Sequence, residues 1–138
     1  TVNAMEKSPE TFADIKSLIL VQPLKGQTSV ERSCTNFGIP VEAGISTFEP
    51  IYTKITGLPI EDHDVTKKIK HINVPTFFLQ VRNDMNSRAS DIQWMYDNTP
   101  VKDKKISWVE DTPWRFHGYT YFSEHPEQMV KWYDAHMK

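Results

Sequence analysis

The sequence has few of the features that would assign it to a specialised class of protein. It contains a single cysteine, Cys34, in 138 residues, which excludes a disulfide framework within the chain. Sixteen basic and eighteen acidic side chains give a net charge of −2, so charge gives no reason to expect a nucleic acid or a membrane surface as partner. No apolar run approaches the roughly 18–20 residues that cross a bilayer, and the first residues show no signal-peptide pattern. These features favour a cytoplasmic protein.

Three short apolar runs predict β-strands, at residues 17–21, 76–81 and 105–110. The first two are almost continuously apolar, which is typical of strands buried on both faces of a parallel sheet. Capped or amphipathic segments around these runs predict helices at about 2–7, 9–15, 29–36, 64–72, 87–99 and 123–137. This alternation predicts an α/β fold with parallel strands and right-handed crossovers.

Residues 24–72 are the least regular part of the predicted fold. Outside the short helices near 29–36 and after Asp64, five helix-breaking residues interrupt the pattern, namely Pro40, Gly44, Pro50, Gly57 and Pro59. Apolar residues are frequent between them, which excludes a disordered linker. We therefore predict a mostly irregular segment that covers another part of the molecule. Residues 24–72 are a candidate cap or insertion within one domain formed by residues 1–138.

Asp84 and His117 are the candidate site residues. Asp84 follows the second predicted strand and His117 lies 33 positions later, in a predicted loop from 111 to 122 after the third strand. The carboxyl ends of neighbouring parallel strands share one edge of the sheet, where sites of α/β proteins collect. A carboxylate that orients an imidazole lets the imidazole take a proton from a nucleophile. The alternatives are a helix-capping Asp84 and a solvated loop His117.

The sequence lacks a nucleophile in the usual setting. It contains no G-x-S-x-G pattern, which places a serine on a sharp turn between a strand and a helix. Four of its serines are better interpreted as helix caps or loop residues: Ser8, Ser29, Ser46 and Ser87. Cys34 has no such flanking residues either, so we interpret it as a structural thiol.

Three segments resemble a known family. They are Ile72–Asp84, which has an apolar strand followed by an acid loop, Glu110–Phe122, and His125–Met129 at the start of the last helix. Together they resemble the C-terminal half of an α/β-hydrolase domain of the dienelactone-hydrolase-like or esterase-like kind, over essentially all 138 residues. The resemblance implies that Asp84 is the acid of a catalytic triad and His117 its base. Arg82 stands where family members usually have glycine, and His125 is a second candidate base whose simpler interpretation is a helix cap.

The resemblance implies a serine hydrolase that acts on an ester-like small molecule. Its nucleophile would lie a dozen or so residues before Thr1, so the chain would be a fragment that is inactive in isolation. The alternative is a non-catalytic binding or assembly module that keeps a hydrolase-like scaffold. The partner expected for the chain is the missing N-terminal half of the fold or a second copy, because the strand at 17–21 would otherwise be an exposed apolar edge.

No metal or organic cofactor is expected. The polar run from Glu61 to Asp64 is better interpreted as a solvated loop that ends in a helix cap than as a metal site. Four aromatic side chains are candidates for a substrate pocket, although the simpler interpretation is that they cover the sheet: Phe37, Phe48, Tyr52 and Trp114.

Overall fold

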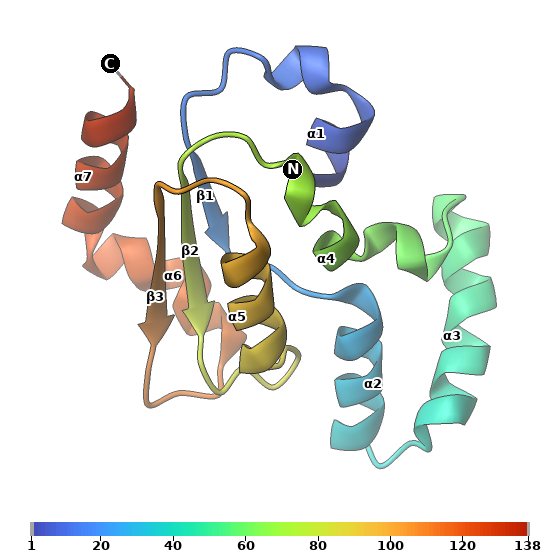
Figure 1. Cartoon of the computed structure of the whole chain (residues 1–138). Helices are drawn as coiled ribbons and strands as arrows, with labels where there is room; N and C mark the ends of the chain where they lie inside the picture. The colour runs from blue at the N-terminus through green and yellow to red at the C-terminus, as the bar shows by residue number, and fades with distance from the viewer. Residues whose placement is uncertain (1, 138) are drawn as a thin grey trace.

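The computed structural model describes residues 2–137, apart from the side chain of His63. A parallel sheet in the order β1-β2-β3 forms its centre (Figure 1), from β1 (Leu18–Val21), β2 (Thr76–Val81) and β3 (Lys104–Val109). The register aligns Leu20, Phe78 and Ile106 across the three strands. The predicted α/β fold with parallel strands is confirmed.

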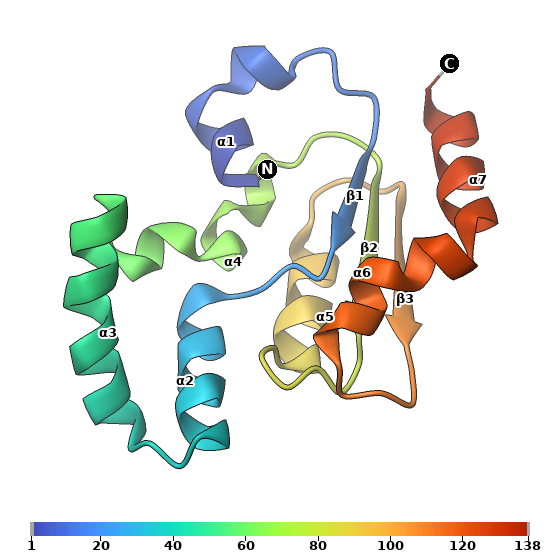
Figure 2. The same ribbon diagram turned by 180° about the vertical axis from the view of Figure 1, so that it is seen from behind.

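Helices cover both faces of this sheet. The helical elements are α1 (Val2–Lys7), η1 (Pro9–Phe12), α2 (Gly26–Asn36), α3 (Val41–Thr56), η2 (Ile60–His63), α4 (Val65–Lys68), η3 (Ile69–His71), α5 (Ala89–Asn98), α6 (Arg115–Glu124) and α7 (Pro126–His136). Helix α5 lies in front of the sheet in Figure 1, and α6 lies in front of it in Figure 2, seen from behind. The hairpin of α2 and α3 extends to one side of the sheet.

The central strand β2 carries the core on both of its faces. Phe78 is fully buried and meets Tyr96 of α5 edge-on, with ring centroids 5.8 Å apart. Phe77 is fully buried on the opposite face, where it packs against Phe122 of α6 and Trp132 of α7. The ring centroids of these two pairs are 5.8 and 5.7 Å apart. Burying each of these side chains contributes about 1.5–3 kcal/mol. Strand β2 is therefore packed against α5 on one face and against α6 and α7 on the other.

The prediction of an irregular segment at 24–72 is wrong in its centre. Residues 41–56 form the sixteen-residue helix α3, which continues through Gly44 and Pro50. Pro40 stands at its N-cap and Gly57 ends it in the left-handed conformation, with φ +71°, where glycine is favoured. Apolar residues spaced three to four apart, Phe48, Ile51 and Ile55, follow the helical period that the proline and glycine obscured.

The prediction of a loop from 111 to 122 is also wrong, because α6 begins at Arg115. The hydroxyl of Thr112 accepts a hydrogen bond from the Trp114 backbone N–H at 3.1 Å just before this helix. Gly118 lies in its middle and lowers the intrinsic helix propensity, which is why the sequence pattern favoured a loop. Gly118 is nevertheless buried within this helix, where the Gln22 side chain lies directly against it.

The capping prediction for Asp64 is confirmed. Its side chain accepts from the Thr66 backbone N–H at 3.0 Å, as an N-cap of α4. His125 occupies the predicted N-cap position of α7, with Pro126 in the first turn, but its side chain makes no capping hydrogen bond. None of the helices formed by residues 2–137 is long and apolar enough to cross a membrane.

The C-terminal helix α7 is attached to the sheet through His136. Its Nδ1 lies 2.6 Å from the Trp132 carbonyl oxygen and its Nε2 lies 3.0 Å from Oδ2 of Asp103, which precedes β3. Burial acts to lower the pKa of His136, but these two hydrogen bonds and the charge of Asp103 outweigh it, so that the pKa is raised. The imidazolium form therefore joins α7 to the loop before β3.

Candidate functional site

The carboxyl ends of the three strands meet at one edge of the sheet. Gln22 follows β1, Asp84 follows β2 after a short loop, and Asp111 follows β3. Gln22 and Asp111 have left-handed backbones, with φ of +52° and +59°, and are the non-glycine residues with positive φ among those described. Such conformations cost about 1–3 kcal/mol and cluster at functional sites. The strand ends therefore form a candidate active site.

Asp84 is the buried centre of this edge, with 1% of its surface exposed. Its Oδ1 accepts from the Asn86 backbone N–H at 2.7 Å. Its Oδ2 accepts from Gln80 Nε2 at 3.0 Å and from Arg115 Nη1 at 2.7 Å. A buried carboxylate requires such donors because its ionised form is costly to remove from water. Asp84 is thus an ion-paired group that also forms the predicted turn through the Asn86 N–H, but it does not cap α5, whose N-cap is Arg88.

Arg115 joins the Asp84 carboxylate to two other elements. It is the first residue of α6 and is 9% exposed. Its Nη2 donates to the Gln22 carbonyl oxygen at the end of β1, and its Nε donates to the Tyr119 hydroxyl at 2.9 Å. Its Nη1 also donates to the Ser87 hydroxyl at 3.2 Å. One guanidinium therefore connects the ends of β1 and β2 with the first turn of α6.

Gly118 lets α6 approach the end of β1 closely. A Cβ atom at this position would lie 1.4 Å from the amide end of the Gln22 side chain. Gln22 is itself 2% exposed. With its amide turned to suit its neighbours, Gln22 donates to Asp84 Oδ2 at 3.3 Å and accepts from the Val81 N–H at 3.1 Å. Gly118 therefore makes room for a side chain that contacts the acid.

His117 lies on the exposed side of α6, two residues after Arg115. Its Nδ1 is 2.7 Å from the hydroxyl of Thr112, which follows β3. Among the hydrogen bonds formed by residues 2–137, none joins His117 to Asp84, and each of the two has its own partners. The structure brings both to the same edge of the sheet, through the contact of the Met85 N–H with the Pro113 carbonyl at 3.3 Å. Their pairing as acid and base stays a prediction.

A pocket of about 520 Å³ surrounds His117. It is formed by the loop after β3 and by α6, and it contains Trp114, His117, Tyr121 and His125 among its lining residues. The ring of His125 lies 4.4 Å from that of Tyr121. Both candidate bases and one candidate pocket residue, Trp114, therefore share this pocket.

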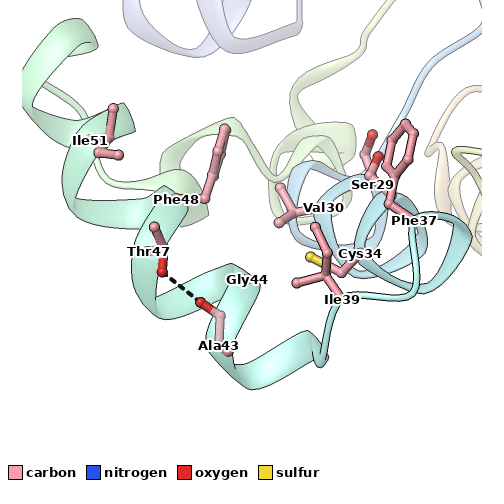
Figure 3. A pocket seen from close by; sticks show the side chains of 11 residues that line it. Ser29, Val30, Cys34, Phe37, Ile39, Ala43, Gly44, Thr47, Phe48 and Ile51 are labelled. Atoms are coloured by element: carbon pink, nitrogen blue, oxygen red, sulfur yellow. Dashed lines mark hydrogen bonds between the residues drawn. The ribbon is translucent and has the colours of Figure 1, made fainter.

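The other three candidate pocket residues lie elsewhere, on the hairpin of α2 and α3. Phe37 and Phe48 line an apolar groove of about 600 Å³ between these helices (Figure 3), and Tyr52 stacks on Phe48 with centroids 5.4 Å apart. Helix α2 also contacts the acid loop, because Arg32 Nη2 donates to the Asp84 carbonyl at 3.1 Å. Phe37 and Phe48 thus line a different pocket from Trp114, Tyr52 only stacks beside the first of these pockets, and the role of all four stays a prediction.

Sequence reasoning missed Arg115, Gln22 and Thr112 as members of this site. Arg115 lies after β3 and so shares an edge with the acid after β2, which is a signal that the sequence contained. The left-handed backbone of Gln22 and the contact of Thr112 with His117 depend on tertiary structure and leave no local pattern. Of the side chains that the structure describes, no three His, Cys, Asp or Glu residues gather as a metal site would require.

Comparisons with known proteins give a fold but no family. The sequence matches no protein-family model and no curated protein. It is similar in structure to the esterase Pf2001 of Pyrococcus furiosus, solved in two crystal forms, with TM-scores of 0.66 and 0.63. The matches cover 99% of this chain at 12% and 13% sequence identity. They cover 50% and 49% of the esterase chain, so this chain spans about half of its length.

The match shows that the chain has the fold of part of an esterase-like α/β protein. Sequence identity this low carries the fold alone, since one fold supports many functions. Function must therefore be argued from the residues at the strand ends.

Proposed function

We propose that this chain is the acid-and-base half of an esterase-like serine hydrolase. In this proposal Asp84 orients His117, and His117 acts as general base and then as general acid. The serine nucleophile comes from sequence outside these 138 residues, in the other half of the domain. The substrate is a small molecule with an ester-like acyl bond.

One observation supports the proposal above all others. A carboxylate that is 1% exposed stands at the carboxyl end of the central strand, and the segment after the neighbouring strand carries a histidine. Fully buried carboxylates are uncommon, because each needs several donors to remain ionised. The similarity over half of an esterase chain is consistent with this arrangement.

The chemistry would follow the usual course of acyl transfer. The serine hydroxyl attacks the acyl carbon while its proton passes to Nε2 of His117, and the proton then goes to the leaving alcohol. Water hydrolyses the acyl-enzyme by the reverse proton transfers. For Asp84 to orient the base, Nδ1 of His117 must exchange the Thr112 hydroxyl for the Asp84 carboxylate.

A second candidate function is a non-catalytic binding or assembly module. The ion pair of Asp84 with Arg115, 2.7 Å apart, favours it, because the carboxylate already has a cationic partner. In that case Asp84 and Arg115 stabilise the strand ends, and His117 is a surface residue.

Labelling with a fluorophosphonate distinguishes the two functions. The probe reacts with serines that a neighbouring base activates, and it is applied to the protein that includes the sequence before Thr1. We expect one labelled serine outside residues 1–138, with labelling lost in His117→Ala. His125→Ala is the matched control, because it removes the other histidine of the same pocket.

The absence of any labelled serine would favour the non-catalytic module. Labelling that persists in His117→Ala but disappears in His125→Ala would move the role of base to His125. Both outcomes would contradict the assignment of His117.

A further inference from the structure

We infer that Arg115 is a positioning residue for the hydrolase reaction, acting through both Asp84 and the helix that carries His117. This inference rests on the proposed function. Arg115 contacts no reacting atom in this scheme. It holds the orientation of the acid and the first turn of α6.

The hydrogen bonds at Asp84 divide the carboxylate into an occupied and a partly free oxygen. Oδ2 accepts from both Gln80 and Arg115, at 3.0 and 2.7 Å. Among the described residues, Oδ1 accepts one hydrogen bond, from the Asn86 backbone N–H. Each carboxylate oxygen has about two acceptor sites, so Oδ1 keeps one for an imidazole N–H. The hydrogen bonds from Gln80 and Arg115 to Oδ2 therefore leave one acceptor site of Oδ1 for His117.

The same guanidinium fixes the segment on which His117 lies. Arg115 and Gly118 are the buried residues of α6, whereas Phe116 and Tyr119 are 69% and 51% exposed. The first turn of this helix is thus attached to the sheet chiefly through the contacts of Arg115. His117 lies two positions after Arg115 in the chain, so a shift of the guanidinium moves the base as well as the acid.

An arginine suits this role better than a lysine. Its planar group donates in several fixed directions at once, and here it reaches Asp84, Ser87, Gln22 and Tyr119. A lysine ammonium at this position would keep the positive charge but could not reproduce all of these directions. Charge and geometry can therefore be separated by substitution.

The test is steady-state hydrolysis of p-nitrophenyl acetate by the protein that includes the sequence before Thr1. Arg115→Gln removes charge and geometry, and Arg115→Lys removes geometry alone. Arg82→Gln is the matched control, because Arg82 follows the same strand but pairs with Glu110 at the surface. In Arg115→Gln we expect kcat to fall by about 100-fold, the loss typical of a misplaced catalytic group, with KM nearly unchanged.

Arg115→Lys is expected to lose a similar part of kcat, and it decides the test if Arg115→Gln does not fold. A kcat equal to that of the wild type in folded Arg115 variants would overturn the inference while leaving the proposed function intact. A loss of activity that raises KM as much as it lowers kcat would reduce Arg115 to a structural residue. A wild-type protein without hydrolysis would overturn both the proposed function and this inference.

Discussion

The ion pair of Asp84 and Arg115 should contribute far more to stability than a second ion pair nearby. Asp84 and Arg115 have side chains that are 1% and 11% exposed, with 2.7 Å between the charged atoms. Arg82 and Glu110 form a pair of the same type at 2.8 Å, with side chains 43% and 49% exposed. The two pairs share the end of β2 and differ mainly in burial, so each serves as the control for the other.

Removing one partner of the buried pair leaves an uncompensated charge inside the protein. Such losses cost about 3–5 kcal/mol, whereas exposed pairs contribute about 0.2–1 kcal/mol. We expect Asp84→Asn and Arg115→Met each to lower the free energy of unfolding by about 3–5 kcal/mol. The double variant should lose no more than the weaker single variant, because no charge is left unpaired. Arg82→Met should cost less than about 1 kcal/mol.

Urea unfolding followed by far-ultraviolet circular dichroism measures these differences. The slope of the free energy against urea concentration should be the same for all variants, which shows that the folded state keeps its compactness. Additive losses in the double variant, or equal losses for the buried and exposed pairs, would refute the argument from burial.

Three other features allow shorter tests. A Cβ atom at Gly44 would lie 2.2 Å from Cys34 Sγ, so Gly44→Ala should destabilise the α2–α3 hairpin by about 1–3 kcal/mol. Adding Cys34→Ala to this variant should restore the melting temperature. Failure of that rescue would contradict the contact. The raised pKa of His136 means that its ion pair with Asp103 stabilises the fold fully below the ordinary pKa of about 6.5 and less as pH rises through the raised value. The stability difference between wild type and Asp103→Asn in unfolding experiments should therefore shrink as pH rises above the ordinary histidine pKa and through the raised one, and a difference that grows with pH would show the wrong sign. In the described sheet β1 pairs with β2 alone, so we expect the isolated 138-residue chain to self-associate through that edge; a monomer in light scattering would contradict this.

The sequence was sufficient to predict the sheet, because short, continuous apolar runs such as those of β1 and β2 are typical of strands buried on both faces. It was insufficient for α3, where Pro50 and Gly44 suggested breaks but flank an apolar stripe with helical spacing. It also failed at α6, whose apolar and polar residues follow no stripe, because the helix is attached through Arg115 and Gly118. Tertiary contacts of this kind leave no periodic pattern to detect.

The candidate site was predictable only in part, because some of its contacts also depend on tertiary structure. Asp84 could be placed from its position after a buried strand, and its burial supports a role beyond a helix cap. The partner of its carboxylate could not be chosen from spacing, since Arg115 and His117 are two residues apart on one turn. Only the direction of each side chain on α6 separates them, and that direction depends on the packing of Gly118 against Gln22.

The most direct test of the central claim is a crystal structure of the fluorophosphonate adduct of the protein that includes the sequence before Thr1. The account predicts a phosphonylated serine outside residues 1–138, with its Oγ within hydrogen-bond reach of His117 Nε2. Nδ1 of His117 should donate to Oδ1 of Asp84, while Arg115 keeps Oδ2. A structure in which the labelled serine is activated by another residue, or in which no serine carries the label, would contradict it.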